Sequence, residues 1–387
     1  MEFADRPATR LATRLAFFVG GFGIACWAPL VPFAKQRLAV DDGTLGVLLL
    51  CIGLGSVVAM LATGALSARY GSKPIIVTSG IALALILPLL TVAASPATLG
   101  AALLAFGAAL GSLDVAMNVH AVEVERAAKK PLMSGFHALF SVGGFAGSTL
   151  MTFLLSLHLG ALESTALCSV LMLIAMFVAT PRLLRAVQAA SGPLFVMPRG
   201  IVLLIAALTC IAFLAEGALL DWSALLITGK GLVAATQGGL GYMLFAIAMT
   251  VGRLTGDAVT ARIGDRATLV WGGLVAVGGF AVLLVAPVAT LALAGFLLIG
   301  LGASNIVPVL FRRAGAQHTM PAALAIAAIT TTGYAGVLMG PALVGFVAKA
   351  VGLETSFWML LALLCVVPCC ATLVTPAPVR QTGLARD

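Results

Sequence analysis

Residues 64–73 read Gly64-Ala-Leu-Ser-Ala-Arg69-Tyr-Gly71-Ser-Lys73, and a faint copy of this stretch lies 193 residues further along the chain. The copy reads Asp257-Ala-Val-Thr-Ala-Arg262-Ile-Gly264-Asp-Arg266, so an arginine, a glycine and a final cation recur in register. The same offset pairs further glycines, namely Gly46 with Gly239, Gly107 with Gly300, Gly143 with Gly336, and Gly147 with Gly340. A single ungapped offset that holds across several apolar segments indicates an internal duplication.

The composition is typical of a protein that resides in a lipid bilayer. Of the 387 residues, 61% are hydrophobic and only 9% are charged, whereas soluble domains carry roughly 25% charged residues. A bilayer-spanning helix needs about 20 apolar residues. We expect twelve such spans, at residues 11–34, 43–67, 74–94, 97–121, 132–158, 162–181, 200–228, 233–257, 268–287, 289–311, 321–349 and 353–375. The sequence therefore predicts an all-α polytopic membrane protein whose twelve transmembrane helices form two pseudo-symmetric six-helix halves, residues 1–190 and 191–387.

The distribution of positive charge predicts the orientation. With a cytoplasmic N-terminus, 17 of the 22 Lys and Arg residues fall on the cytoplasmic side, and four fall on the other side. The positive-inside rule then places both termini in the cytoplasm. The N-terminal segment leads into the first span without the cleavage pattern of a signal peptide, so we expect a retained first helix. The expected location is the cell (inner) membrane, as a multi-pass monomer.

Other function classes find little support in the sequence. The net charge of +8 is scattered over the breaks between spans, without the basic, aromatic-laced patch that binds nucleic acid. All seven cysteines fall in apolar spans without zinc-like spacing, so we expect no disulfide and no metal site. The sequence lacks a phosphate-cradling loop, a His/Glu metal cluster and a nucleophile elbow, which argues against an integral enzyme or a receptor. We expect neither enzymatic activity nor a cofactor.

The two repeated stretches resemble the signature loops of the major facilitator superfamily, whose members are transporters. The first loop is a tight turn made by Gly64, Arg69, Gly71 and Lys73, although Ala68 stands where the family usually has an acid. The resemblance implies that the loop cations latch the cytoplasmic side, by pairing with helix C-terminal carbonyls and acidic groups. The second loop keeps an acid and several cations, at Arg253, Asp257, Arg262, Gly264 and Arg266.

The fourth span contains Gly111-Ser-Leu-Asp114-Val-Ala-Met-Asn118, which is similar to the fucose-permease-like branch of this superfamily. A spacing of four residues puts Asp114 and Asn118 on one helical face, and the resemblance implies that this face lines a central cavity. A carboxylate at membrane depth is costly unless it is paired, hydrated or protonated. Asp114 is therefore the predicted proton-coupling residue, and Asn118 is a predicted substrate-binding residue. The alternative is that Asp114 is a structural carboxylate bonded to a neighbouring helix.

The same resemblance implies a second acid on the first helix, where this chain has Ala28. The repeat offset leads from Ala28 to Asp221, in the stretch Ala215-Glu216-Gly-Ala-Leu-Leu-Asp221-Trp222 of the seventh span. Counted from the start of that span, Glu216 lies near the midplane, which makes it the second candidate proton-coupling group. Asp221 lies near the outer rim, where it is a candidate substrate contact, an outer gate or a solvated cap.

Other polar and aromatic residues have two interpretations each. Trp27 either stacks on a cyclic substrate or packs in the core, and Asn305, in the tenth span, is a candidate substrate hydrogen-bonder. His137 either relays protons or is a satisfied structural histidine. Arg253 and Asp257 are four residues apart, so we expect them to pair with each other in a structural or gating role.

These observations predict a secondary active transporter that moves a small solute by alternating access. Polar side chains on the first, fourth, seventh and tenth spans suit a sugar-like or other polar metabolite, with protons as the coupling ion. The fifth span lacks the Gly-Pro element that marks many drug/proton antiporters, which favours symport. The alternative is a proton-coupled antiporter that exports drugs or metabolites.

Overall fold

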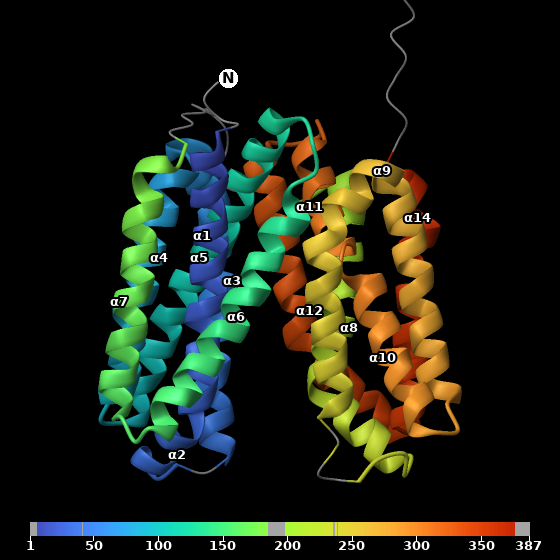
Figure 1. Ribbon diagram of the computed structural model, residues 1–387, viewed down its shortest axis with the longest axis horizontal. Helices are drawn as coiled ribbons and strands as arrows, with labels where there is room; N and C mark the ends of the chain where they lie inside the picture. Colours follow the sequence, from blue (N-terminus) through green and yellow to red (C-terminus); the bar gives the residue numbers. More distant parts are fainter. Residues whose placement is uncertain (1–5, 41, 185–197, 235–236, 238, 376–387) are drawn as a thin grey trace, which may run out of the picture.

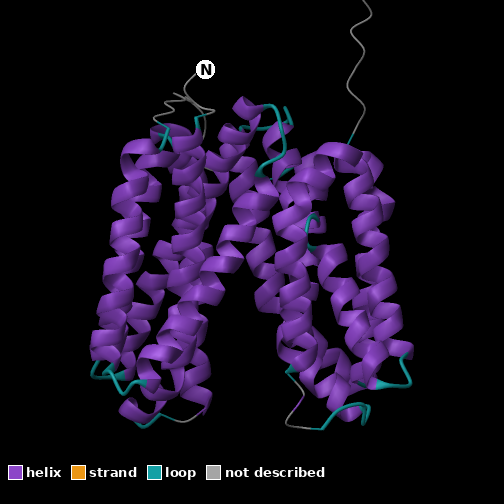
Figure 2. Cartoon of the chain, viewed as in Figure 1, coloured by secondary structure: helices purple, strands orange, loops and turns teal. Residues whose placement is uncertain are grey.

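The computed structural model describes residues 6–40, 42–184, 198–234, 237 and 239–375, and these residues form helices joined by turns and loops (Figure 2). The first half of the chain contains α1 (Pro7–Trp27), α2 (Val31–Leu38), α3 (Asp42–Tyr70), α4 (Ser72–Val92), α5 (Pro96–Ala128), α6 (Met133–Ser156) and α7 (Ala161–Ala179). The second half contains α8 (Ile201–Gly229), α9 (Leu240–Val285), α10 (Ala289–Ala303), α11 (Ile306–Ala316), α12 (Ala322–Val351), α13 (Leu353–Leu364) and α14 (Val366–Val374).

Eleven helical segments of the described residues are long and apolar enough to cross a membrane. One of them, α9, has 46 residues, a length of about 69 Å at 1.5 Å per residue, which is more than twice the roughly 30 Å hydrocarbon core. Its backbone leaves the helical conformation at Gly264. Division of α9 at Gly264 gives two crossings and confirms the twelve spans expected from the sequence.

The two signature loops have the same backbone geometry. Gly71 and Gly264 both have φ 81° and ψ 164°, a conformation that only glycine adopts without strain. Each of these glycines breaks a continuous run of helix, between α3 and α4 in one case and within α9 in the other. The repeated glycine therefore makes the same turn in both halves.

The two halves stand side by side (Figure 1). In the first half α1 packs on α6 and α3 packs on α5, and in the second half α8 packs on α12 and α9 packs on α10. These pairs are related by the repeat, so the halves share their internal packing. The predicted boundary at residues 190 and 191 lies outside the described residues.

The repeated glycines mark the points where helices cross most closely. A side chain at Gly107 would meet the backbone of Ile52, and one at Gly300 would meet the backbone of Phe245, which lies 193 residues after Ile52. Gly143 faces the backbone of Phe18 in the same way. Small residues at such crossings let helix backbones approach, so this part of the repeat encodes packing within each half.

The exterior of the bundle is apolar. Phe145, Phe177 and Phe346 expose 76%, 81% and 76% of their surfaces. Apolar side chains so exposed on several helices are expected where lipid, rather than water, is the solvent.

The two halves meet most closely at the end of the molecule where α1 begins, and their helices diverge toward the opposite end (Figure 1). We call the first the signature-loop end, because the turns at Gly71 and Gly264 lie there. Two seams join the halves. Helix α3 packs on α12 along one seam, and α6 packs on α9 along the other.

Candidate functional site

The Asp114 carboxylate lies where the two halves meet, since α5 packs on α12 there. The Asn118 side-chain amide, one turn further along α5, donates to the Asp114 carboxylate Oδ1 at 3.1 Å and to the Asp114 carbonyl at 2.9 Å. The Tyr334 hydroxyl of α12, from the other half, lies close to the Asp114 carboxylate. Asp114 and Asn118 therefore share a face of α5, as their spacing predicted, and that face meets the second half.

Tyr334 is a site residue that the sequence did not point to. Its hydroxyl reaches an acid 220 residues away in the chain, and nothing in the local pattern of α12 marks it. The repeat offered one signal, because the position 193 residues earlier is Ser141. Ser141 also makes a polar contact between the halves.

Glu216 and Arg253 form an ion pair within the second half. An Arg253 guanidinium nitrogen, Nη2, lies 3.8 Å from the Glu216 carboxylate. The other terminal nitrogen, Nη1, donates to the Ser141 hydroxyl of α6 at 2.9 Å. The expected pairing of Arg253 with Asp257 is therefore wrong, since Arg253 turns toward α8 and α6, and Asp257 is engaged elsewhere.

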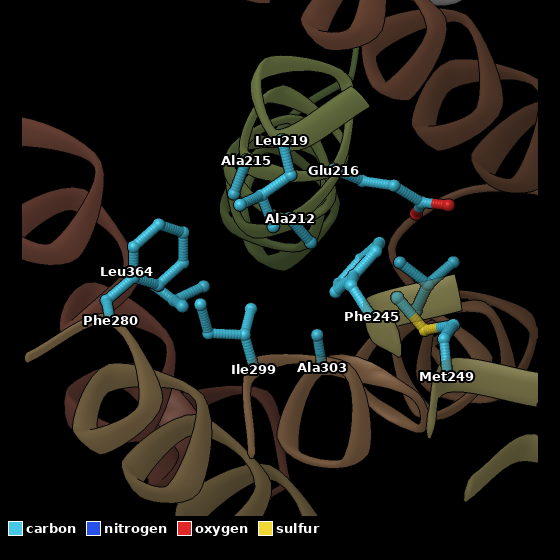
Figure 3. A pocket seen from close by; sticks show the side chains of 11 residues that line it. Ala212, Ala215, Glu216, Leu219, Phe245, Met249, Phe280, Ile299, Ala303 and Leu364 are labelled. Atoms are coloured by element: carbon cyan, nitrogen blue, oxygen red, sulfur yellow. The ribbon is translucent and has the colours of Figure 1, made fainter. Parts of the chain in front are cut away.

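Glu216 also lines a small apolar cavity inside the second half (Figure 3). Its carboxylate points away from Phe280 and Leu364, which lie on the far side of that cavity (Figure 3). The cavity walls are otherwise apolar side chains from α8, α9, α10, α11 and α13. Glu216 thus presents its charge toward Arg253 and the α6–α9 seam rather than into the cavity.

Asp257 binds the first turn of α6 across the seam. Its two carboxylate oxygens accept the backbone N–H groups of Ser134, at 3.0 Å, and Gly135, at 2.7 Å. Free N–H groups at a helix N-terminus carry partial positive charge, so a carboxylate is a favourable partner there. Asp257 therefore fastens the second half to the first.

Glu125 of α5 binds the two backbone N–H groups that precede Ser134 in the chain. It accepts the backbone N–H groups of Leu132, at 2.6 Å, and Met133, at 2.8 Å, so two carboxylates, one from each half, occupy four successive donors at the start of α6. Glu125 also accepts from Arg312 of α11 at 2.5 Å, and Arg312 pairs with Asp265 at 2.5 Å.

No sequence pattern predicted that Glu125, Asp265 and Arg312 would form an ion-pair cluster between the halves. Glu125 and Arg312 are 187 residues apart and do not correspond under the repeat offset, so no spacing rule connects them. A weak signal existed, because both are charges close to the ends of apolar spans. The contact is reinforced by Arg126, which donates to the Gly315 carbonyl of the other half.

The first signature loop contributes packing more than charge. A side chain at Gly64 would meet Ala327 of α12, so this glycine permits the close approach of α3 and α12. Lys73 donates to the carbonyl of Leu183 at 3.4 Å, just beyond the C-terminal end of α7, and the Arg69 guanidinium lies 5.2 Å from the centre of the Tyr70 ring. In the second loop, Arg262 and Arg266 are exposed.

The predicted substrate-binding residues Trp27, Asn305 and Asp221 lie in three different environments. Trp27 is buried, with 3% of its surface exposed, which favours its packing role. Asn305 donates to the Gly252 carbonyl at 3.0 Å, and so it ties the break between α10 and α11 to α9. Asp221 is exposed.

His137 lies between two aromatic rings at the start of α6. Its ring centre is 5.2 Å from that of Phe17 of α1 and 5.4 Å from that of Phe311 of α11. Its Nε2 atom is buried and has no hydrogen-bond partner among the described residues. His137 therefore packs between the halves beside the Arg253 contact.

The sequence matches the family model described as Major Facilitator Superfamily over residues 14–323. It is 48% identical, over 367 residues, to an uncharacterized MFS-type transporter of Yersinia pestis, with 95% of this chain and 96% of that protein covered. It is 31% identical to the membrane protein MosC of Rhizobium meliloti, with 94% and 89% covered.

The fold is similar to those of two solved transporters. The Escherichia coli fucose:proton symporter FucP superimposes with a TM-score of 0.73 at 14% identity, over 96% of this chain and 99% of that one. The human organic anion transporter MFSD10 superimposes with a TM-score of 0.73 at 16% identity, over 96% and 100%. The chain is a multi-pass membrane protein and belongs to the major facilitator superfamily of secondary transporters.

Proposed function

We propose that this transporter is a proton-coupled symporter of a small polar solute, that it works by alternating access, and that Asp114 is its proton-coupling residue. The observation that carries the proposal is the position of the Asp114 carboxylate, which is hydrogen-bonded to Asn118 in its own half and lies close to the Tyr334 hydroxyl of the other half. An intramembrane acid in contact with both halves can link its own protonation to their relative position.

The chemistry of the carboxylate supports this role. An ionised carboxylate only accepts hydrogen bonds, so it can take the Asn118 amide and the Tyr334 hydroxyl together. A protonated Asp114 must donate from one oxygen, so one of these two donors loses its acceptor or turns. Protonation thus changes the contact between the halves directly.

Alternating access requires the closed end of the molecule to open. The contacts of Asp257 with α6, and of Glu125 with Arg312, close the signature-loop end. We propose that this end faces the cytoplasm, with both chain termini on that side, and that these contacts break when the halves rock to expose the solute on that face.

Polar atoms near Asp114 support a hydrogen-bonding solute. The Asn118 Oδ1 atom and the Thr331 hydroxyl are buried and have no hydrogen-bond partner among the described residues. Asn118 shares its helix face with Asp114, and Thr331 lies one turn before Tyr334 on α12, so one such atom stands on each side of the Asp114–Tyr334 contact. A hydroxylated solute would supply their partners. The structurally similar FucP is, by name, a fucose:proton symporter.

The experiment uses purified protein in proteoliposomes that contain a pH-sensitive dye. A thermal-shift screen against monosaccharides, organic acids and amphiphiles first identifies a solute that stabilises the folded state. Addition of that solute outside the vesicles should carry protons inward in native protein and not in Asp114→Asn. The matched control is Glu163→Gln, since Glu163 is an exposed acid at the start of α7.

The direction of the dye signal separates the two coupling modes. Acidification inside the vesicles on inward solute movement means symport, whereas alkalinisation means antiport. Proton flux in Asp114→Asn equal to that of native protein would exclude Asp114 as the coupling residue.

A further inference from the structure

Arg253 stands between two acids at the α6–α9 seam. It is buried, with 7% of its surface exposed, and it contacts Glu216 at 3.8 Å and Ser141 at 2.9 Å. Asp257 lies one turn further along the same helix and holds the backbone N–H groups of Ser134 and Gly135. Helix α9 therefore touches α6 twice, once through a cation and once through an acid.

The hydrogen-bonding capacity of Arg253 is incompletely used. Its Nε atom is buried and has no partner among the described residues, and its contact with Glu216 is longer than a charge-assisted hydrogen bond of about 2.7–2.9 Å. A buried guanidinium without its counter-charge is strongly destabilised. Loss of the negative charge of Glu216 would therefore drive Arg253 toward another acid.

Asp257 is the acid that Arg253 can reach on its own helix, since residues four apart are neighbours on the helix surface. A guanidinium–carboxylate pair joins two full charges and can be bidentate, whereas the backbone N–H groups of Ser134 and Gly135 offer only partial positive charge. Asp257 would consequently exchange Ser134 and Gly135 for Arg253. The start of α6 would then lose its fastening to the second half.

We propose that Arg253 is a positioning residue that couples Glu216 to the Asp257–α6 contact, so that neutralisation of Glu216 releases the signature-loop end along the α6–α9 seam. This inference rests on the proposed function, in which Glu216 changes its protonation or its contacts during transport. An event at Glu216 then reaches the closed end of the molecule through Arg253 and Asp257.

The charged and titratable groups around Arg253 and Asp257 do not prevent Arg253 from turning from Glu216 to Asp257. Tyr242 of α9 lies within electrostatic range of Glu216, of Arg253 and of Asp221 on α8. His137 of α6 lies close to Arg253. On the side of Asp257, the nearby charges are those of Glu125 on α5 and Arg312 on α11, and these are already paired with each other.

The three residues of this proposed relay, Glu216, Arg253 and Asp257, lie at the α6–α9 seam, and the repeat does not reproduce them at the α3–α12 seam. The positions 193 residues before Glu216, Arg253 and Asp257 are Gly23, Met60 and Gly64. Met60 is buried in the hydrophobic core, and Gly64 packs against Ala327 of α12. At these equivalent positions the α3–α12 seam is therefore held by close packing, whereas the α6–α9 seam is held by polar contacts that a change of charge can break.

Hydrogen–deuterium exchange tests the relay in the full chain, in nanodiscs, without solute and without a pH gradient. Amide exchange at Ser134 and Gly135 reports the Asp257 contact, and exchange at Leu132 and Met133 reports the Glu125 contact as an internal control. In Glu216→Gln, exchange at Ser134 and Gly135 should rise by about tenfold, within the 5–150-fold span of typical couplings between sites, while the two control amides change little.

A second variant identifies the route. Arg253→Gln alone should keep Ser134 and Gly135 protected, because Asp257 then has no arginine to turn toward. The double variant Glu216→Gln/Arg253→Gln should also stay protected. Asp257→Ala should expose both amides whatever residue stands at position 216.

Three results would overturn the proposal. Exchange at Ser134 and Gly135 could stay unchanged in Glu216→Gln, it could rise equally with and without Arg253, or it could rise together with that of the control amides. Thermal unfolding of each variant checks the fold, and Glu216→Ala and Arg253→Met replace any variant that fails to fold. Because no solute moves in this experiment, its outcome is independent of the test of symport by Asp114.

Discussion

Two hydroxyl-bearing residues occupy equivalent positions of the repeat, and each contacts a charged side chain of the opposite half. Ser141 of α6 accepts a hydrogen bond from Arg253, and the hydroxyl of Tyr334 of α12, 193 residues later, lies close to the Asp114 carboxylate. The scaffold is duplicated, but the charge that each hydroxyl meets is an arginine on one seam and an acid on the other. The equivalent positions of the repeat therefore mark where the two halves contact each other, and the residues that differ between the repeats determine which charge takes part in each contact.

Removal of the Tyr334 hydroxyl should weaken the link between Asp114 and the second half. Loss of a hydroxyl that can bond to a charged group costs about 1.5–3 kcal/mol, so Tyr334→Phe should lower proton-driven solute uptake by roughly tenfold or more, with only a small fall in the thermal unfolding temperature. The measurement is the initial uptake rate in proteoliposomes under an imposed pH gradient.

The matched control removes a hydroxyl from the same helix. Thr332 donates to the Ala328 carbonyl within α12, so Thr332→Val should leave uptake close to that of native protein. A native uptake rate in Tyr334→Phe would show that the Asp114–Tyr334 contact takes no part in coupling.

At the scale of helices, glycines at crossings and at turns position the site. Helix α6 crosses α1 at Gly143, and this crossing holds the start of α6, with Ser134 and Gly135, beneath Asp257. His120 performs a similar task with hydrogen bonds. It accepts from the backbone N–H of Leu184 at 3.0 Å and contacts the Thr13 hydroxyl at 3.1 Å, so it ties α5 to α1 and to the segment that follows α7.

A single methyl group distinguishes a crossing glycine from an ordinary one. Gly143→Ala would place its Cβ against the carbonyl of Phe18, and overpacking of this kind costs about 1–3 kcal/mol. The thermal unfolding temperature should fall. Gly278→Ala is the control, because a side chain at Gly278, within α9, would meet nothing within 4 Å, and alanine favours the helix. Equal unfolding temperatures of the two variants would contradict the assignment of Gly143 to a close crossing.

At the scale of the whole molecule, the number of spans and the positions of the turns could be predicted from the sequence, because hydropathy and glycine geometry are local properties. Gly71 and Gly264 make the same turn since the same requirement acts on both. The partners of charges could not be predicted in this way. Arg253 prefers Glu216 of α8 and Ser141 of α6 to Asp257 on its own helix, because packing between helices decides which acid is within reach.

The ion pairs at the signature-loop end could not be predicted from the sequence either. Glu125, Arg312 and Asp265 come from three helices and both halves, and only the relative placement of the halves brings them together. Asp114 and Asn118 could be predicted as a pair because they lie one turn apart on one helix, whereas their partner Tyr334 depends on how α12 packs on α5. Contacts within one helix could therefore be predicted from the sequence, whereas contacts between the two halves could not.

The most direct test compares solute exchange with solute accumulation in proteoliposomes that contain Asp114→Asn. Asparagine imitates a permanently neutral Asp114, so the variant should exchange labelled for unlabelled solute across the membrane at a rate near that of native protein, while it loses accumulation driven by a pH gradient. Accumulation at the native level would contradict proton coupling through Asp114, and loss of both exchange and accumulation in a folded variant would show that Asp114 serves solute binding or structure instead.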